Sequence, residues 1–211
     1  MLILVNQHNM HLYSRELESM FQLRKKVFID KLGWDIEPVG DMEIDQFDTC
    51  EAHYLIYLDK DSNAVGSTRL IPTTEPYILG DIFSSLVEIE EVPRCASTWE
   101  TTRFCADRQY APMDVSCILM AGMIEFAYEL RIKNYVSVTD VRLEKQIQRC
   151  GWTPLRLGSV QNINGCRVVG NRFMVRDQFY QRLTSKCQEK REVYIQNLTT
   201  LSLNINKDKV A

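Results

Sequence analysis

A strand pattern that leads directly into a long apolar helix pattern, with another strand after it, most restricts how this chain can fold. Residues 98–107 have the β-branched and aromatic content of a strand. After Pro112, apolar residues recur at helical spacing to about residue 133, and residues 135–139 again resemble a strand. Strands that lead into long helices predict a sheet covered by helices, in an α/β or α+β arrangement.

The other patterns add strands and helices before and after this unit. We expect strands at 1–6 and 165–175 and a hairpin of 52–59 and 63–71. We also expect two helices, one from a cap at Ser14 to about residue 32 and one from a cap at Asp140 to Cys150. The chain has 211 residues, is 45% hydrophobic, and contains no repeat or linker, which indicates a single domain over 1–211. No element is assigned to 191–211. The expected architecture is a three-layer domain around a mixed sheet.

Composition argues against several kinds of partner. The chain has 28 acidic and 25 basic residues, a net charge of -3, so no overall field attracts nucleic acid or an acidic membrane surface. No segment approaches the ~20 apolar residues of a membrane span, and the N-terminus does not resemble a signal peptide. We therefore expect a cytoplasmic protein. The seven cysteines never occur in CxxC or CxxH spacing, so no metal site is predicted.

Two arginines interrupt apolar faces. Arg24 completes the apolar stripe of the first predicted helix, and Arg69 shares a strand face with apolar residues. A buried unpaired charge is costly, so each arginine requires a carboxylate or a charged ligand. The segment EIDQFDT supplies Glu43, Asp45 and Asp48. Two interpretations remain open at this point, a structural ion-pair cluster and a site for a polar ligand.

Aromatic residues lie close to this charged segment in the sequence. Phe28 belongs to the first predicted helix, and Trp34 follows its end. Aromatic rings next to carboxylates can hold a compact cation such as a sulfonium or a quaternary ammonium group. Most such rings are ordinary core residues, so the pair supports a cation site only together with the charges.

The stretch TWETTRF places a glutamate and an arginine in a predicted buried strand. Regular alternation puts Glu100 on one face and Arg103 on the other. The two side chains can share a site only if the strand bulges between them, and bulges are common next to active sites. We therefore predict a bulge at Thr101–Thr102. The alternative is that Glu100 and Arg103 serve separate salt bridges.

These residues together resemble the acyl-homoserine-lactone synthases of bacterial quorum sensing, the LuxI type, which have a GNAT-like acetyltransferase fold. The resemblance extends loosely over residues 1–176. The matching positions, in chain order, are Arg24, Phe28, Trp34, Glu43, Asp45, Asp48, Gly66, Arg69, Pro72, Thr73, Phe83, Trp99, Glu100, Arg103 and Phe104.

The resemblance implies an acyltransferase that acylates the amine of S-adenosylmethionine and then closes a lactone with release of 5′-methylthioadenosine. S-adenosylmethionine is a substrate, and no cofactor is implied. The implied catalytic residues are Glu100, as general base, and Arg103. The implied S-adenosylmethionine site comprises Arg24, Phe28, Trp34, Asp45, Asp48, Arg69, Phe83 and Arg103. The implied acyl-chain pocket comprises Thr101, Phe104, Met123, Phe126, Ser137, Leu143 and Ile147.

The acyl donor is expected to be a carrier protein rather than coenzyme A. Related acyltransferases that use coenzyme A commonly have a glycine-rich loop that binds its pyrophosphate, and this chain has RQYAPMDVSC at that point. Acyl carrier protein is acidic, and Arg142, Lys145 and Arg149 form a basic stripe on one helix, although a simple solvated face explains them equally well.

Two other functions remain open at this stage. One is a GNAT-type N-acyltransferase that uses acyl-CoA on another amine. The other is a non-enzymatic sensor that binds S-adenosylmethionine.

Overall fold

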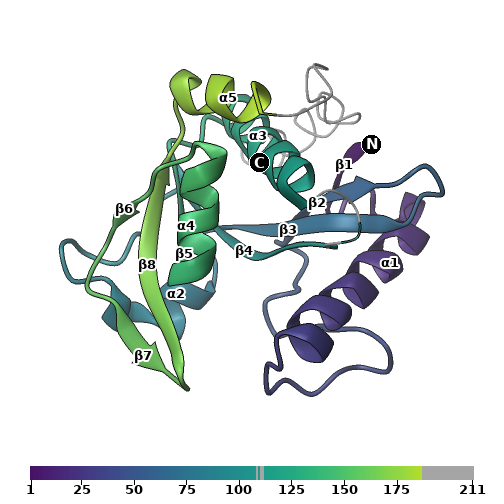
Figure 1. Cartoon of the computed structure of the whole chain (residues 1–211), viewed down its shortest axis with the longest axis horizontal. Helices are drawn as coiled ribbons and strands as arrows, with labels where there is room; N and C mark the ends of the chain where they lie inside the picture. The colour runs from purple at the N-terminus through teal and green to yellow at the C-terminus, as the bar shows by residue number, and fades with distance from the viewer. Residues whose placement is uncertain (108, 110–111, 187–211) are drawn as a thin grey trace.

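The computed structural model describes residues 1–107, 109 and 112–186. Within them one mixed sheet has the strand order β1-β2-β3-β4-β5-β8-β6, and β7 pairs with β8 at the end (Figure 1). The strands are β1 Leu2–Val5, β2 His53–Leu58, β3 Ala64–Pro72, β4 Thr98–Ala106, β5 Asn134–Asp140, β6 Leu155–Arg156, β7 Gln161–Ile163 and β8 Cys166–Met174.

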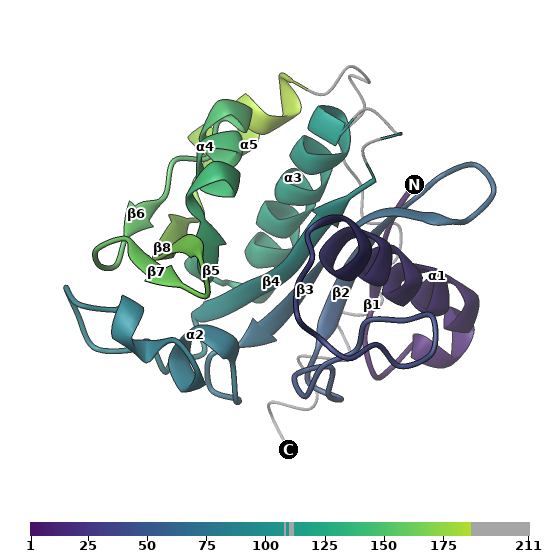
Figure 2. The same cartoon turned by 60° about the horizontal axis from the view of Figure 1, so that its bottom comes forward.

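Helices cover both faces of the sheet, which confirms the predicted three-layer arrangement. Figure 2 shows α1 and α2 on one side and α3, α4 and α5 on the other. Their bounds are α1 Ser14–Arg24, α2 Ile78–Asp81, α3 Pro112–Leu130, α4 Val141–Cys150 and α5 Asp177–Thr184, with short 3-10 turns at Met10–Leu12 and Ser84–Leu86. The core on the α3 side is one continuous apolar cluster, whereas the opposite side has separate clusters under α1 and α2.

Two central strands separate in the middle of the sheet. β4 and β5 are parallel, and only three residue pairs join them, the last being Glu100 with Val136. Beyond this point β5 continues to pair with β8 as far as Asp140. The backbone edges that β4 and β5 turn toward each other therefore lack a strand partner past Glu100.

The first helix begins differently from its prediction, but the helical segment ends where it was expected, close to residue 32. Ser14 is the first helical residue rather than its cap; Tyr13 occupies the cap position and makes no side-chain capping bond. The chain enters α1 from a 3-10 turn, so the Ser14 hydroxyl points back to the Met10 carbonyl, at 3.5 Å. After Arg24 the helix continues as a π-helix over Lys25–Lys31. Such segments are rare and often occur at functional sites.

The later predicted elements are confirmed with small shifts at their ends. Asp140 caps α4 by accepting a hydrogen bond from the Arg142 N–H, and Gly151 ends that helix with a left-handed backbone at φ 115°. The hairpin and the strand expected at 165–175 are present as β2, β3 and β8. No sequence pattern predicted α2, α5, β6 or β7. The unassigned segment 191–211 lies outside the described residues.

The predicted bulge exists, but it lies two residues further along β4. Arg69 is opposite Thr102, and Ser67 is opposite Cys105, so β4 has one extra residue between these pairs. The bulge is therefore at Arg103–Phe104 instead of Thr101–Thr102. Arg103 has a φ of 52°, in the left-handed region that non-glycine residues seldom adopt. This local twist turns Arg103 toward the face that carries Glu100 and Thr102.

Candidate active site

Three arginines and three acids form a closed ring of ion pairs on the sheet face covered by α1. The N–O distances around the ring are Arg24–Glu43 2.6 Å, Glu43–Arg103 3.0 Å, Arg103–Asp45 2.6 Å, Asp45–Arg69 2.6 Å, Arg69–Asp48 2.8 Å and Asp48–Arg24 2.7 Å. Each charge thus lies between two charges of opposite sign, and the formal charge of the ring is zero. Five of these residues were predicted from the sequence to form one site. Glu43 was named among the nearby acids and the matching positions, but not as a site residue.

The arginines come from three different elements, and the acids come from one loop. Arg24 ends α1, Arg69 lies in β3, and Arg103 lies at the bulge of β4. The loop holds its own shape, because the Asp48 carboxylate accepts a hydrogen bond from the Asp45 N–H at 2.8 Å. A single turn of chain therefore presents three carboxylates to three arginines.

Neighbouring hydroxyl groups complete the ring. Tyr54 on β2 donates to Asp48 at 2.9 Å, and the Thr102 hydroxyl accepts from Arg69 Nε at 3.1 Å. No sequence pattern indicated either residue as part of the site. Alternation along β2 and β4 places them on the ring's side of the sheet, but only the register of β2, β3 and β4 shows that they reach it.

Burial and ion pairing act in opposite directions on the charges of this ring. Burial by itself lowers the pKa of Arg24, but its hydrogen bonds and charge interactions with Asp48 and Glu43 outweigh this effect and raise the pKa overall. Burial likewise raises the pKa of Asp48, and Arg24 and Arg69 more than offset it, so the pKa is held well below its usual range. These groups therefore remain ionised at neutral pH.

The ring opens to solvent beside two stacked aromatic rings. The side chains of Arg103 and Asp45 are 10% and 15% exposed, whereas those of Arg24 and Arg69 are fully buried. Phe28 and Trp34 stack at 4.6 Å, and the guanidinium carbon of Arg103 lies 5.7 Å and 5.4 Å from their ring centres. The π-helix carries Phe28 into this position, and Trp34 remains 39% exposed. An aromatic surface thus borders the accessible edge of the ring.

Glu100 lies on the same face of the sheet but outside the ring. Its two carboxylate oxygens accept hydrogen bonds from the backbone N–H groups of Ile78 and Leu79, at 2.9 Å and 2.7 Å, where α2 begins. The side chain is fully buried. Burial raises the pKa of Glu100 to about 7, although these N–H groups and the charges of Arg69 and Arg103 oppose the rise. A carboxyl group with this pKa exchanges its proton near neutral pH.

The predicted acyl-chain residues gather on the opposite face, around the apolar core between the sheet, α3 and α4. Thr101 bonds to Thr68 at 2.8 Å and lies 3.9 Å from the Met123 sulfur. Phe126 packs edge-on against Trp99 and is a fully buried core residue. Within the same core or packed against it lie Phe104, Leu143 and Ile147. Ser137 belongs to the β5 face that carries Tyr135 of this core, and its hydroxyl donates to the Val138 carbonyl at 3.3 Å.

Two other sets of predicted residues lie away from the ring. Phe83 packs in the apolar cluster under α2, and among the described contacts none joins it to a ring residue. Arg142, Lys145 and Arg149 are exposed along α4, as a docking surface requires.

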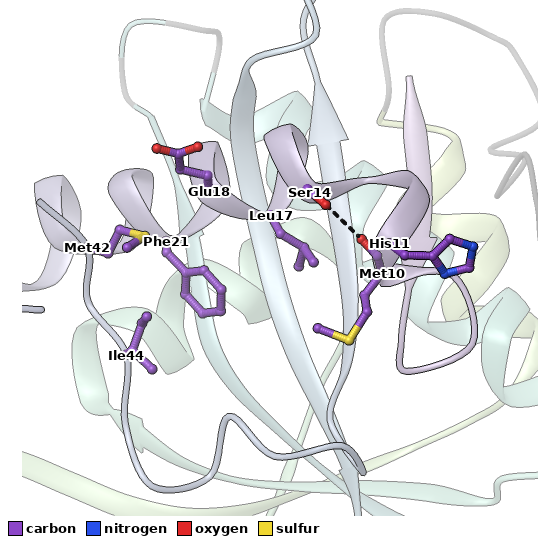
Figure 3. A pocket seen from close by; sticks show the side chains of 8 residues that line it. All are labelled: Met10, His11, Ser14, Leu17, Glu18, Phe21, Met42 and Ile44. Atoms are coloured by element: carbon purple, nitrogen blue, oxygen red, sulfur yellow. Dashed lines mark hydrogen bonds between the residues drawn. The ribbon is translucent and has the colours of Figure 1, made fainter.

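An open hollow of about 480 Å³ lies between α1 and the loop that carries the acids (Figure 3). It is mostly apolar, and Met42 and Ile44 line it from the loop side while Phe21 lines it from α1. Glu43, between these two loop residues, points the other way into the ring. None of the predicted site residues lines this hollow.

Among the described residues, every helix is too short or too polar to span a lipid bilayer. Over the same residues, no cluster of three or more His, Cys, Asp or Glu side chains could hold a metal ion.

Known proteins are similar to this chain in sequence and in fold. A family described as autoinducer synthase matches residues 8–183. A probable acyl-homoserine-lactone synthase of Sinorhizobium fredii is 30% identical over 79% of this chain and 84% of its own. The solved structure of TofI with an inhibitor and MTA has a TM-score of 0.71 and 30% identity, over 82% of this chain and 89% of that one. MesI, described as a CoA-dependent acyl-homoserine lactone synthase, has a TM-score of 0.79 and 28% identity, over 89% and 95%.

The family match covers most of the chain and includes every member of the charged ring. The GNAT-like fold predicted from the resemblance is likewise that of the matched synthase structures. The chain therefore belongs to the autoinducer synthase family, the acyltransferases that make acyl-homoserine lactones.

Proposed function

We propose that this enzyme transfers an acyl group from acyl carrier protein to the amine of S-adenosylmethionine and then closes the lactone ring. The observation that carries the proposal is the aromatic pair Phe28 and Trp34 at the open edge of the ion-pair ring, on the same sheet face as Glu100. A sulfonium nucleoside with a carboxylate and an ammonium group matches such a surface. TofI, a relative, was solved with MTA bound.

In this proposal the open edge of the ring binds the amino acid part of the substrate. Arg103 binds the carboxylate, because its guanidinium is partly exposed and lies between the aromatic rings and Asp45. The aromatic pair binds the sulfonium group by cation–π attraction. Arg24, Asp48 and Arg69 are too deeply buried to contact a ligand directly, so they position Arg103 and Asp45. Phe83, which packs under α2, is assigned to the nucleoside end of this site.

Glu100 acts as the general base. The α-ammonium group must lose a proton before the amine can attack the thioester carbonyl, and a carboxylate with a pKa of about 7 is suited to that step. Because Glu100 is fully buried, we assign the transfer to an intervening water molecule. The extra residue at the Arg103–Phe104 bulge supplies a backbone N–H for the oxyanion that forms. The carbon–sulfur bond of the thioester then breaks, the thiol leaves with the second proton lost by the attacking nitrogen, and N-acylated S-adenosylmethionine remains.

Lactone closure then requires little from side chains. The carboxylate oxygen attacks the carbon attached to sulfur, the carbon–sulfur bond breaks, and neutral 5′-methylthioadenosine leaves. The attack is intramolecular, and the sulfonium is a good leaving group. Arg103 holds the carboxylate for this step, which is why we class it with Glu100 as catalytic.

The acyl chain is assigned to the core side of the sheet, where β4 and β5 have separated. We propose as its lining the residues Thr101, Phe104, Met123, Phe126, Ser137, Leu143 and Ile147. The donor reaches this side from α4, where Arg142, Lys145 and Arg149 offer an exposed basic stripe to an acidic carrier. MesI is described as CoA-dependent, so acyl-CoA is the second donor to test. Both substrates are products of cytoplasmic metabolism, and the proposal places the enzyme there.

The test is to incubate the purified enzyme with S-adenosylmethionine and a panel of acyl carrier thioesters and acyl-CoAs, with mass spectrometry as readout. We expect 5′-methylthioadenosine and an acyl lactone in equal amounts, with higher kcat/KM for carrier thioesters. Glu100→Gln should still bind S-adenosylmethionine but form no product, which separates the enzyme from a sensor. Acylation of another amine without release of 5′-methylthioadenosine would support the N-acyltransferase alternative. Formation of no lactone with any donor would refute the proposal.

A further inference from the structure

Two lysines of the π-helix share one carboxylate at the end of β4. The Nζ atoms of Lys26 and Lys31 lie 2.5 Å and 3.4 Å from the carboxylate oxygens of Asp107. The Asp107 side chain is 6% exposed, whereas those of Lys26 and Lys31 are 43% and 40% exposed. Among the described residues neither lysine forms an ion pair with another acid. These three side chains therefore carry one more positive than negative charge, and the ammonium groups remain accessible to solvent.

The π-helix explains why both lysines reach the same carboxylate. On an α-helix the neighbours along one face are three or four residues apart, and residues five apart point in different directions. The wider turn of a π-helix, with its i→i+5 hydrogen bonds, aligns position 26 with position 31. The bond of this spacing from the Leu32 N–H to the Val27 carbonyl measures 3.0 Å. The irregular turn that places Phe28 beside the ion-pair ring thus also directs two lysines to the end of β4.

The lysine pair lies where the two parallel central strands end apart from each other. Asp107 directly follows β4, and Asp140 is the last residue of β5. The two strands stop pairing after Glu100, well before these ends. The region outside the carboxyl ends of diverging parallel strands is a common place for ligands in α/β sheets. Lys26 and Lys31 lie at the β4 end of this region, and the exposed Arg142 follows the β5 end.

A thioester donor that reacts at the proposed oxyanion site would extend along β4 to this point. The bulge at Arg103–Phe104 is three residues before Asp107, about 10 Å at ~3.3 Å per residue. The phosphopantetheine arm of a donor is a chain with two amide groups between its sulfur and its phosphate. Such a chain can pair with the unpartnered backbone edge of β4 in the way that an added strand does. Its phosphate then emerges at the end of β4, beside the two ammonium groups.

Side chains from another element have to bind this phosphate, because the chain has no glycine-rich loop at that point. The segment that begins after Asp107, RQYAPMDVSC, contains no glycine. Close approach of backbone N–H groups to a phosphate usually depends on glycine. A phosphodiester carries one negative charge, which equals the excess positive charge of Lys26, Lys31 and Asp107.

We propose that Lys26 and Lys31 bind the phosphate of the donor's phosphopantetheine arm, while Asp107 holds the two ammonium groups in place. This inference rests on the proposed function, because it requires a thioester donor that lies along β4. Carrier-bound thioesters and acyl-CoA both contain this phosphate, so the site serves either donor. It is distinct from the basic stripe on α4, which is assigned to the surface of the carrier protein itself.

The experiment compares kcat/KM for two small thioesters of the same acyl chain, one on pantetheine and one on 4′-phosphopantetheine. The wild type should prefer the phosphorylated thioester by about tenfold, the effect of a hydrogen bond to a charged group. Lys26→Met and Lys31→Met should each reduce this preference severalfold, and the double variant should abolish it. The loss should be confined to the phosphorylated thioester, and Lys26→Arg should retain the preference. Lys25→Met is the matched control, because Lys25 lies on the same π-helix but pairs with Asp30.

The two sources of the phosphate are distinguished by the full donors. The double variant Lys26→Met Lys31→Met should raise the KM both for acyl carrier thioesters and for acyl-CoA. Charge reversal at Lys145 and Arg149 should raise the KM for the carrier thioesters alone. Thermal unfolding shows whether each variant is folded.

Equal kcat/KM for the two small thioesters, or a preference that Lys26→Met and Lys31→Met leave unchanged, would overturn the inference while leaving the proposed function intact. Absence of lactone from all thioesters would count against the proposed function. In that event calorimetry with 4′-phosphopantetheine and with pantetheine decides the inference. Tighter binding of the phosphorylated compound that depends on both lysines supports it, and equal affinities overturn it.

Discussion

Replacing Asp48 by asparagine should destabilise the protein far more than removing an ordinary surface charge. The Asp48 carboxylate is 2% exposed and accepts hydrogen bonds from Arg24 at 2.7 Å and 2.8 Å, from Tyr54 at 2.9 Å and from the Asp45 N–H at 2.8 Å. It also pairs with Arg69 at 2.8 Å. Asparagine has one acceptor oxygen, and its NH₂ would face guanidinium donors. The buried guanidinium groups of Arg24 and Arg69 would then each lose one of their two carboxylate partners.

The expected loss is ~3–5 kcal/mol, the cost of breaking a buried ion pair while one partner remains. This is a large part of the ~5–15 kcal/mol that stabilises a domain. Urea unfolding is the assay, and with a slope of ~2 kcal/mol per molar the midpoint should fall by about 2 M. Asp30→Asn is the matched control, because Asp30 pairs with Lys25 on the surface, at 48% and 26% exposure. The control should lose less than ~1 kcal/mol.

The stability of the protein should depend on pH through the ionisation of Asp48. Because the pKa of Asp48 is held below its unfolded value, its contribution to stability is present above the unfolded pKa and disappears as the pH falls through the folded one. Asp48→Asn should therefore lose less stability than the wild type on acidification. Equal losses for Asp48→Asn and Asp30→Asn at neutral pH would refute the argument that the ring charges are buried and interdependent.

Three further predictions concern Glu100 and the basic stripe on α4. If Glu100 is the base, kcat/KM should increase as the pH rises through about 7, because the carboxyl group must lose its proton, and a profile flat between pH ~6 and ~8 would contradict that role. Glu100 also affects stability with the opposite sign to Asp48: its raised pKa favours the folded state at low pH, and this contribution should be lost as the pH rises through about 7. Charge reversal at Lys145 and Arg149 should raise the KM for acyl carrier thioesters several-fold with little change in kcat, whereas the KM for S-adenosylmethionine should stay the same. An unchanged KM for the carrier would place its docking surface elsewhere.

The sequence was most informative where a charged residue interrupted an apolar pattern. Arg24 and Arg69 stood out in this way because periodicity alone places them on buried faces, and burial requires a partner. The acids of the segment 43–48 were the nearest candidates, and the ring confirms that they are the partners. The bulge in β4 could be predicted too, because without it Glu100 and Arg103 would point to opposite faces.

The sequence could not locate features that depend on how distant segments meet. The bulge position follows from the pairing of β4 with β3, and that register is set by packing across the whole sheet. The expected cap at Ser14 failed because the preceding 3-10 turn changes how the chain enters α1. The backbone partners of Glu100 come from a helix of four residues, too short to leave a periodic pattern.

By itself, then, the sequence determined which side chains must be buried with opposite charges and which strands and helices would carry them, because periodicity and desolvation are local properties. Only the tertiary structure decided that three arginines and three acids close into one ring, that Glu100 lies outside it, and that the bulge of β4 falls at Arg103–Phe104. Those facts depend on strand register and on contacts between residues far apart in the chain, which no local pattern records.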